Sequence, residues 1–576
     1  MLSEKDLRPI GARGAGRAGA WQLAVTVLLL ALSLAGAICW QEACYPFGDD
    51  YLYRLVPPEG TQRMRPLSEW MPAAREIGSV GDYFSAVRIN FMAYSGRLSN
   101  FLYFPFGLMP HWADKAVCGI IVFMMLWGML VAGYSRDARR HPWYVALAIT
   151  AMWTIFPWDN FMQSSAFVFN YPLATVAVLG FIVLLRGVAN YGCVGKAGVV
   201  ALAFVIGWMH EGFAFCAGAY LVVYALCERP GSRVLWGVVA AGAVGLSVVM
   251  YSAVHARMED WASARVFTTS SMRADSVLVA GVVAPILLGA VMVWFMRKQA
   301  GNVEWKRMRG EMFGLLAGAM AGLTMCVVLG MYRRERWPAD VFTMLIYLRF
   351  AELCLPRLLG FLNRGVLLWG SAFFGVAYGV WLWGLVGWQA EVSEVRAELE
   401  AEVAPRYSTD ARVVYGRLMA GGSVPWIYMG IPNPMYEANF NGDFFGAYWT
   451  GRDDVKFLPR EYEGKTFEEL PEIPGTAGLR GVYPWLMSDR ANPGQLEVHG
   501  GELGFMDSPG PWLLSWLKGA VLGRADVIHP FPRFEETRVN DSTVMYRVYL
   551  SRPYTFGRRA IERIDTVASG GEEVAK

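Results

Sequence analysis

Charged residues are scarce in this chain. Asp, Glu, Lys and Arg make up 18% of its 576 residues, while hydrophobic residues make up 55%. Soluble proteins carry roughly 25% charged residues, so this composition excludes an ordinary soluble enzyme and predicts an integral membrane protein. The chain also has only six histidines and a nearly balanced formal charge of +3. Nothing in that balance indicates a nucleic-acid partner.

Clustered cysteines are missing as well. The eight cysteines form no CxxC pair, and none follows Cys354. This spacing argues against a zinc site and against a disulfide framework. Most of the cysteines lie in apolar segments, which favours a role as small buried hydrophobic side chains. Cys39 and Cys44 are the one pair close enough in sequence to be considered for a disulfide.

Long apolar segments are abundant. A membrane-spanning helix needs about 20 apolar residues, and on this basis we expect about eleven spans, of which the fifth and sixth are short. The first follows a basic segment, as a signal peptide does, but its apolar stretch is longer, so it is expected to be retained. The expected spans are residues 20–40, 115–134, 142–157, 171–188, 197–209, 211–227, 234–254, 276–296, 311–331, 339–361 and 365–387.

Basic residues are distributed unevenly between the two ends of these spans. They precede the first span and follow every even-numbered span, as Arg136, Arg139 and Arg140 do after the second. Because Lys and Arg gather on cytoplasmic loops, the amino terminus is expected in the cytoplasm. Some basic residues lie in loops expected outside, and these exceptions are Arg257, Arg265, Arg273, Arg333, Arg334 and Arg336.

The expected fold is therefore mainly α, with two parts. Residues 1–387 are expected to form a polytopic membrane domain with a large first outer loop at residues 41–112. In that loop Phe84 begins a helical repeat of apolar residues that predicts an amphipathic helix on the outer leaflet. Residues 388–576 are expected to form an extracytoplasmic α/β domain. Its predicted strands are residues 411–418, 425–430 and 542–550, and its predicted short helices are residues 441–449 and 511–523.

The first candidate site is the pair Asp49 and Asp50, directly after the first span. Adjacent carboxylates repel each other, which tends to raise the pKa of one of them, and a raised pKa suits a general base. The alternative is structural, because Asp is also a common cap at the start of a helix, here one beginning at Tyr51.

Polar residues in the other outer segments are further candidates. Arg97 follows Gly96 in YSGRLSN, and the loop FPWDNFMQSSAFVFNYPL is too apolar to be simply solvated. That loop contains Asp159, Asn160, Asn170 and Tyr171, which could contact a substrate or form a tight turn. His210 and Glu211 interrupt an apolar stretch, where ionisable residues usually face a cavity or a partner.

Two groups of arginines complete the candidates. The cluster Arg333, Arg334 and Arg336 suits a phosphate ligand, since guanidinium groups bind phosphate oxygens in a bidentate manner, although lipid head groups are an alternative. Arg349 and Glu352 lie three residues apart and are expected to neutralise each other as a structural pair.

The motifs GDDY, SGR, FNYP and HEG, at residues 48–51, 95–97, 169–172 and 210–212, occur in segments expected to face outward. Their order resembles that of bacterial members of the GT-C superfamily, membrane glycosyltransferases that take sugars from polyprenyl-phosphate donors. The resemblance covers residues 1–387. It implies an inverting transferase of the bacterial cytoplasmic membrane, acting on a glycan, lipid or protein acceptor and surrounded by membrane lipids.

The resemblance also implies roles for the candidates. Asp49 is expected to be the general base, with Asp50 beside it. Some members use a divalent cation near the acidic pair, and the sequence leaves open whether one binds here. Arg97, Arg333, Arg334 and Arg336 are expected to bind the donor phosphate. The residues expected to bind sugar or acceptor hydroxyls are Tyr51, Asp159, Asn160, Asn170, Tyr171, His210 and Glu211.

The main alternative is a transporter or flippase for a lipid-linked or anionic solute. His210, Glu211, Arg349 and Glu352 would line its path. Transporters often consist of repeated halves, and no internal repeat is evident in this sequence. A membrane acyltransferase is a third candidate, with His210 as its one intramembrane histidine.

Overall fold

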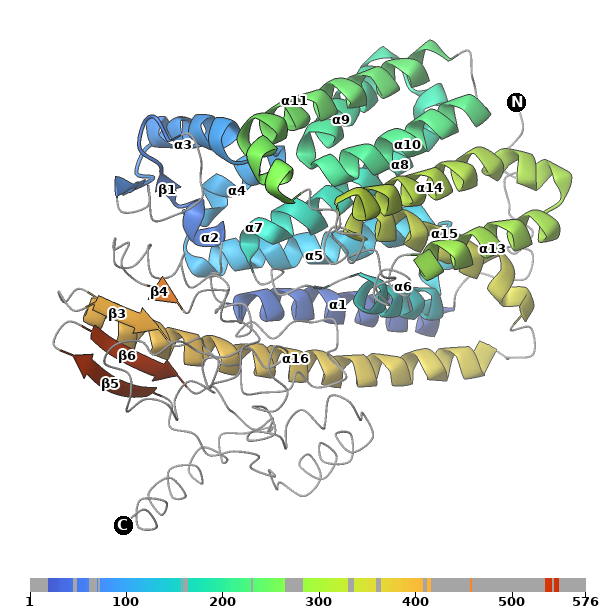
Figure 1. Cartoon of the computed structure of the whole chain (residues 1–576). Helices are drawn as coiled ribbons and strands as arrows, with labels where there is room; N and C mark the ends of the chain where they lie inside the picture. The colour runs from blue at the N-terminus through green and yellow to red at the C-terminus, as the bar shows by residue number, and fades with distance from the viewer. Residues whose placement is uncertain are drawn as a thin grey trace.

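The computed structural model is mainly helical (Figure 1). Its long apolar helices indicate a membrane-embedded protein. Among the residues that the structure describes, six helical segments are apolar over enough length to cross a membrane. They are α1 (Ala20–Glu42), α5 (His111–Gly133), the segment Ser165–Asn190, α10 (Glu211–Glu228), residues Arg233–Ser252 of α11 (Arg233–Ala264) and residues Gly365–Val386 of α16 (Arg364–Tyr407). The structure describes residues 19–44, 49–61, 70, 73–156, 158, 164–228, 232–264, 283–329, 336–358, 364–407, 412–415, 456–457, 534–540 and 543–548.

The other predicted spans also overlap helices. Two shorter apolar helices are α6 (Pro142–Ile155) and α9 (Cys193–Met209). Three more are α13 (Ala284–Gln299), α14 (Asn302–Leu329) and α15 (Trp337–Leu358). Each of the eleven expected ranges therefore contains helix, and six of the helical segments have the length and apolarity of a membrane span. That all eleven cross the membrane stays a prediction.

The segment Ser165–Asn190 changes its helical geometry along its length. It begins as α7 (Ser165–Val168), continues as the π-helix η7 (Phe169–Leu173) and α8 (Ala174–Gly187), and ends in η8 (Val188–Asn190). Pro172 lies inside the π-turn and has no N–H to donate, which breaks the regular hydrogen-bond ladder. Wider π-turns of this kind often occur at functional sites.

The described parts of the first loop, residues 41–112, fold into short elements at one end of the helix bundle. After α2 (Asp49–Leu52), β1 (Leu55–Val56) pairs antiparallel with β2 (Arg75–Glu76), and α3 (Val80–Ala93) and α4 (Leu98–Gly107) follow. The Ser79 hydroxyl accepts a hydrogen bond from the Asp82 N–H at the start of α3. In return, hydrogen bonds from Ser79 and Arg75 hold the pKa of Asp82 below its ordinary value.

The predicted amphipathic helix is present as α3, but a different face is buried. Ala86, Ile89 and Ala93 face the protein, whereas Phe84 is 63% exposed. The apolar repeat that begins at Phe84 therefore lies partly outside the core. Its location on the outer leaflet remains a prediction.

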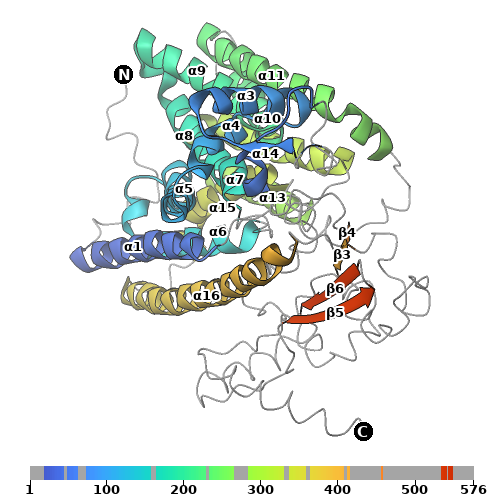
Figure 2. The same cartoon turned by 90° about the vertical axis from the view of Figure 1, so that its left-hand side faces the viewer.

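Helix α16 is 44 residues long and packs beside α1 (Figures 1 and 2). It passes without a break through residue 388, where the sequence predicted a domain boundary. The strands beyond it form a sheet in the order β4-β3-β6-β5, where β6 is parallel to β3 and antiparallel to β5. Their bounds are β3 (Arg412–Tyr415), β4 (Lys456–Phe457), β5 (Phe534–Asn540) and β6 (Thr543–Val548).

Strands β3 and β6 fall within two of the predicted strands, residues 411–418 and 542–550. Strand β5 was not predicted. The remaining predicted elements, residues 425–430, 441–449 and 511–523, lie outside the described residues.

Small residues allow the membrane helices to approach each other closely. A Cβ added to Gly245 of α11 would overlap the carbonyl oxygen of Phe204 of α9, and one added to Gly207 would overlap the carbonyl oxygen of Gly242. At the contact of α1 and α5, a Cβ on Gly119 would lie 2.5 Å from the Ile38 Cα. Lipid chains are as apolar as these helices, so close packing, rather than escape from water, holds them together.

This packing predicts the effect of two alanine substitutions in α11. Gly245→Ala is expected to destabilise the protein by about 1–3 kcal/mol, because the added methyl group must push α9 away. Gly237→Ala is the matched control, because nothing lies within 4 Å of the position of its Cβ. Thermal unfolding in detergent measures both, and equal stability of the two variants would contradict the contact.

Candidate functional site

The side chain of Asp50 is buried and engaged, with only 1% of the residue exposed. Its carboxylate accepts hydrogen bonds from Ser164 Oγ at 2.7 Å, from the Ala166 N–H at 2.9 Å and from the Ser165 N–H at 3.2 Å. Asp50 therefore caps the start of α7. A helix leaves its first N–H groups without partners and carries a partial positive charge there, so a carboxylate is well placed at this position.

The acidic pair was also considered as a helix cap, and the structure shows such a cap at a different helix. A cap was expected for the helix that begins near Tyr51, and the structure shows a cap on α7, more than a hundred residues further along the chain. Asp49 lies beside it in α2. The side chains of Asp49 and Tyr51 lie outside the described part of the structure.

Two charged residues that sequence reasoning missed lie beside Asp50. Asp114 and Lys115, in the first turn of α5, are 3% and 0% exposed. Lys115 Nζ donates to Ser165 Oγ at 2.9 Å, and Ser165 Oγ donates to Asp114 Oδ2 at 2.7 Å. The sequence signal for these two residues was an Asp-Lys pair at the start of an apolar segment, in HWADKAVCG. The pair lies at the edge of the expected span at residues 115–134.

Arg97 and Glu211 form a largely buried ion pair, with 16% and 14% of their side chains exposed. Arg97 Nε donates to Glu211 Oε2 at 2.8 Å, and Arg97 Nη2 contacts Glu211 Oε1, so the pairing is bidentate. Burial acts to lower the pKa of Arg97, but the Glu211 carboxylate more than offsets it and raises that pKa. The sequence assigned these residues to separate roles, and the structure joins them.

Asn170 connects three segments that are distant in the sequence. Its Nδ2 donates to Asn100 Oδ1 at 2.7 Å and to the Ala166 carbonyl oxygen at 3.0 Å. Ser99 Oγ lies 2.5 Å from Asn170 Oδ1 and 3.0 Å from the Met209 carbonyl oxygen. The first loop, the π-turn and the end of α9 are therefore fixed to one another through buried hydrogen bonds, which hold polar groups in defined positions.

His210 occupies the break that the sequence predicted. It lies in extended conformation between α9 and α10, and its Nδ1 accepts a hydrogen bond from the Gly212 N–H at 3.1 Å. In the neutral form its proton is therefore assigned to Nε2. The rings of His210 and Tyr171 are 5.1 Å apart, which places this imidazole against the π-turn.

Arg336 lies at the start of α15, near the same end of the bundle. Its Nη2 donates to the Ile155 carbonyl oxygen at 3.0 Å, and its Nε lies 3.2 Å from Asp340 Oδ2. The adjacent Trp337 donates to Thr175 Oγ1 at 2.9 Å, and its ring is 6.0 Å from that of Tyr171. Arg336 is thus linked to the π-turn through its neighbour.

The structure brings most of the described candidates together at the end of the bundle where α5, α7 and α10 begin, called the first-loop end here. Asp159, Asn160, Arg333 and Arg334 lie outside the described residues. The candidates that hydrogen bonds, ion pairs and ring contacts gather at the first-loop end are Asp50, Arg97, Asn170, Tyr171, His210, Glu211 and Arg336.

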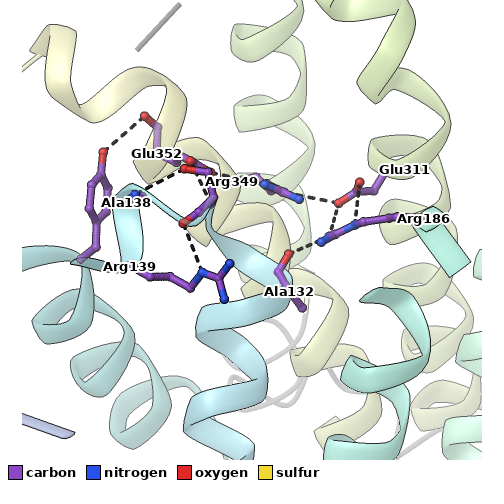
Figure 3. A network of polar contacts seen from close by, with 9 residues as sticks. Ala132, Ala138, Arg139, Arg186, Glu311, Arg349 and Glu352 are labelled. Carbon is purple, nitrogen blue, oxygen red and sulfur yellow. Dashed lines mark hydrogen bonds and ion pairs between the residues drawn. The ribbon is translucent and has the colours of Figure 1, made fainter. Parts of the chain in front are cut away.

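Arg349 and Glu352 lie at the opposite end of the bundle. They pair as expected, at 3.3 Å, but within a larger network (Figure 3) in which Glu311 contacts both Arg349 and Arg186. Glu311 follows Gly310, which packs against Glu228 at the end of α10. Glu211 begins that 18-residue helix, so the two polar sites are roughly 25 Å apart at 1.5 Å per residue.

The described residues do not suggest a metal site beside Asp50. Within those ranges, no three His, Cys, Asp or Glu side chains are grouped to hold a metal ion. Both oxygens of Asp50 already accept hydrogen bonds, and the Lys115 ammonium lies in the same cluster. This donor set fits a helix cap better than a cation ligand.

Comparisons with known proteins add no family assignment, because the chain matches no protein-family model and no curated protein shows significant sequence similarity to it. The geometry of the first-loop end is therefore the basis for the function.

The Arg97 and Glu211 pair generates a prediction about stability. Glu211→Gln is expected to destabilise the protein by about 1–3 kcal/mol, because it removes the charge that pairs with a largely buried guanidinium. The double variant Arg97→Met/Glu211→Gln is expected to be less destabilised than the sum of the single variants. Thermal unfolding of the four proteins measures the coupling.

An exposed ion pair in the first loop provides the control for this cycle. Arg88 Nη2 lies 2.6 Å from Glu59 Oε1, and their side chains are 65% and 72% exposed. Glu59→Gln is expected to change stability by about 0–1 kcal/mol. Additive effects at Arg97 and Glu211 would contradict the buried pair.

Proposed function

We propose that the chain is an inverting membrane glycosyltransferase that moves a sugar from a polyprenyl-phosphate donor to a glycan, lipid or protein acceptor. The observation that carries this proposal is the convergence of an acidic pair, buried arginine and carboxylate groups and the π-turn at the first-loop end. Most of these residues belong to the motifs that resemble the GT-C superfamily. Sugar transfer needs such a set, since a hydroxyl must lose a proton while a phosphate leaves.

The membrane arrangement that we propose has about eleven spans in a bacterial cytoplasmic membrane. The amino terminus is cytoplasmic, and the first-loop end and an α/β domain after α16 are extracytoplasmic. The distribution of basic residues supports this orientation. Arg136, Arg139 and Arg186 lie at the end of the bundle opposite to the first loop, where positive charge is expected on the cytoplasmic side.

In the proposed reaction, Asp49 is the general base. Both oxygens of Asp50 accept hydrogen bonds from the start of α7. This supports different roles for the carboxylates of Asp49 and Asp50. Asp49 takes the proton of an acceptor hydroxyl. The oxygen of that hydroxyl attacks the anomeric carbon of the sugar from the side opposite the phosphate. The new glycosidic bond forms with inversion, the bond from the anomeric carbon to the phosphate oxygen breaks, and polyprenyl phosphate leaves with its electron pair.

Arginines stabilise the negative charge on the leaving phosphate. We assign this role to Arg97, Arg336, Arg333 and Arg334. Glu211 accepts from two of the five N–H groups of Arg97, and this bidentate contact orients the remaining donors. In this proposal Glu211 orients the guanidinium group of Arg97, because the two side chains form a bidentate ion pair.

The π-turn and the α9–α10 break supply the groups for sugar or acceptor hydroxyls. Asn170 and Tyr171 belong to the π-turn, and the His210 ring lies against Tyr171. Tyr51, Asp159 and Asn160 are assigned to the same role on the basis of the resemblance alone.

A transporter is the second candidate function. Charged residues occur at both ends of the bundle, as they do in a gated pathway. However, Arg349 and Glu352 are neutralised in a network roughly 25 Å from Glu211. The described residues therefore support two separate polar sites better than a continuous path.

A transfer assay with purified protein tests the proposal. Wild type is expected to transfer sugar from polyprenyl-phosphate donors to membrane acceptors, and Asp49→Asn is expected to lower the rate by about 10²–10⁴-fold while stability is kept. Asp50→Asn is expected to lower thermal stability as well, since it weakens the cap of α7.

Glu59→Gln, an exposed acid of the same loop, is the control and is expected to transfer at the wild-type rate. Equal transfer by wild type and Asp49→Asn would overturn the assignment of the base. Solute uptake into vesicles that requires Glu211 but not Asp49 would favour the transporter.

A further inference from the structure

Three charged side chains gather around Ser165 at the start of α7. Asp50, Asp114 and Lys115 are at most 3% exposed, and they come from the first loop and from α5. Removing charges from water costs several kcal/mol for each ion, and the cost is recovered only when every charge finds partners. Such residues at membrane depth are expected to have a functional reason.

Ser165 contacts all three charged side chains. Its hydroxyl accepts from Lys115 and donates to Asp114, while its backbone N–H donates to Asp50. One residue at the start of α7 therefore contacts both carboxylates and the ammonium. A change at Lys115 or Asp114 reaches Asp50 through this residue.

The hydroxyl of Tyr103 adds a further polar group to the cluster. It is fully buried and, within the described ranges, makes no hydrogen bond. Burial raises the pKa of Tyr103, and the charges of Asp50 and Asp114 add to this effect. The rings of Tyr103 and Phe169 are 5.4 Å apart, which connects the cluster with the π-turn.

We propose that Lys115 and Asp114 are positioning residues that hold Asp50 on the start of α7 and thereby fix the location of Asp49 in the adjoining turn. This inference rests on the proposed function for the role of Asp49. Asp49 and Asp50 are consecutive residues of α2. Hydrogen bonds that fix the Asp50 carboxylate therefore restrict the position of the Asp49 backbone. Effective catalysis requires the reacting groups to be held within a fraction of an ångström.

A direct role for Lys115 in binding the donor phosphate is the competing explanation. Its ammonium is fully buried and donates to Ser165, which favours the positioning role. The two explanations differ in the kinetic constant that they affect. Loss of a positioning residue lowers kcat. Loss of a group that binds the phosphate equally well in the bound substrate and in the transition state raises KM instead.

The experiment uses the full-length protein in detergent or vesicles with a polyprenyl-phosphate sugar as donor. Lys115→Met and Ser165→Ala are expected to lower kcat, by about 100-fold for Lys115→Met, with KM for the donor within about twofold of wild type. Lys306→Met, at an exposed lysine of α14, is the matched control and should behave as wild type. A rise in KM with unchanged kcat would overturn the positioning role.

A thermal stability cycle tests the same contacts without activity. Lys115→Met removes one positive charge from a cluster with two buried carboxylates, so adding Asp114→Asn is expected to recover part of the lost unfolding temperature. Additive losses, or wild-type stability of Lys115→Met, would overturn the inference. If wild type transfers no sugar with any donor, the proposed function fails, and this cycle still decides whether Lys115 and Asp114 hold Asp50.

Discussion

The need to pair every buried charge determines how the polar parts of this protein are arranged. Asp50 finds its partners at the start of α7, Arg97 finds Glu211, and Glu311 joins two arginines. In an apolar bundle an unpaired charge is strongly destabilising, so each pair must come together for the helices to pack. The pairs therefore fix which helix ends lie side by side, and they gather the candidate residues at one end.

Close helix packing provides the frame in which these pairs form. Gly245 and Gly207 let α9 and α11 touch through their backbones, which sets the position of the α9–α10 break. Glu211 lies directly after that break and reaches Arg97 from there. The small residues and the buried ion pair therefore depend on each other, because a shift of α9 would move Glu211 away from the first loop.

The adjacent aspartates show how one structural interaction can separate two chemically equal residues. Asp50 is held by a hydroxyl and two backbone N–H groups, which occupy both of its oxygens. Asp49 adjoins this fixed point in α2. In the proposed reaction the helix cap and the base are thus neighbours, and the cap provides the rigid reference for the base.

The sequence by itself determined that the protein is membrane-embedded and mainly helical, where its apolar helices lie, and that His210 interrupts one of them. Length, apolarity and periodicity are local properties, so they can be predicted segment by segment. Only the tertiary structure decided that Asp50 caps α7, that Arg97 pairs with Glu211, and that Lys115 belongs to the same cluster as Asp50. These pairings join residues 50 or more positions apart along the chain, and they depend on how whole helices cross, which no local pattern specifies.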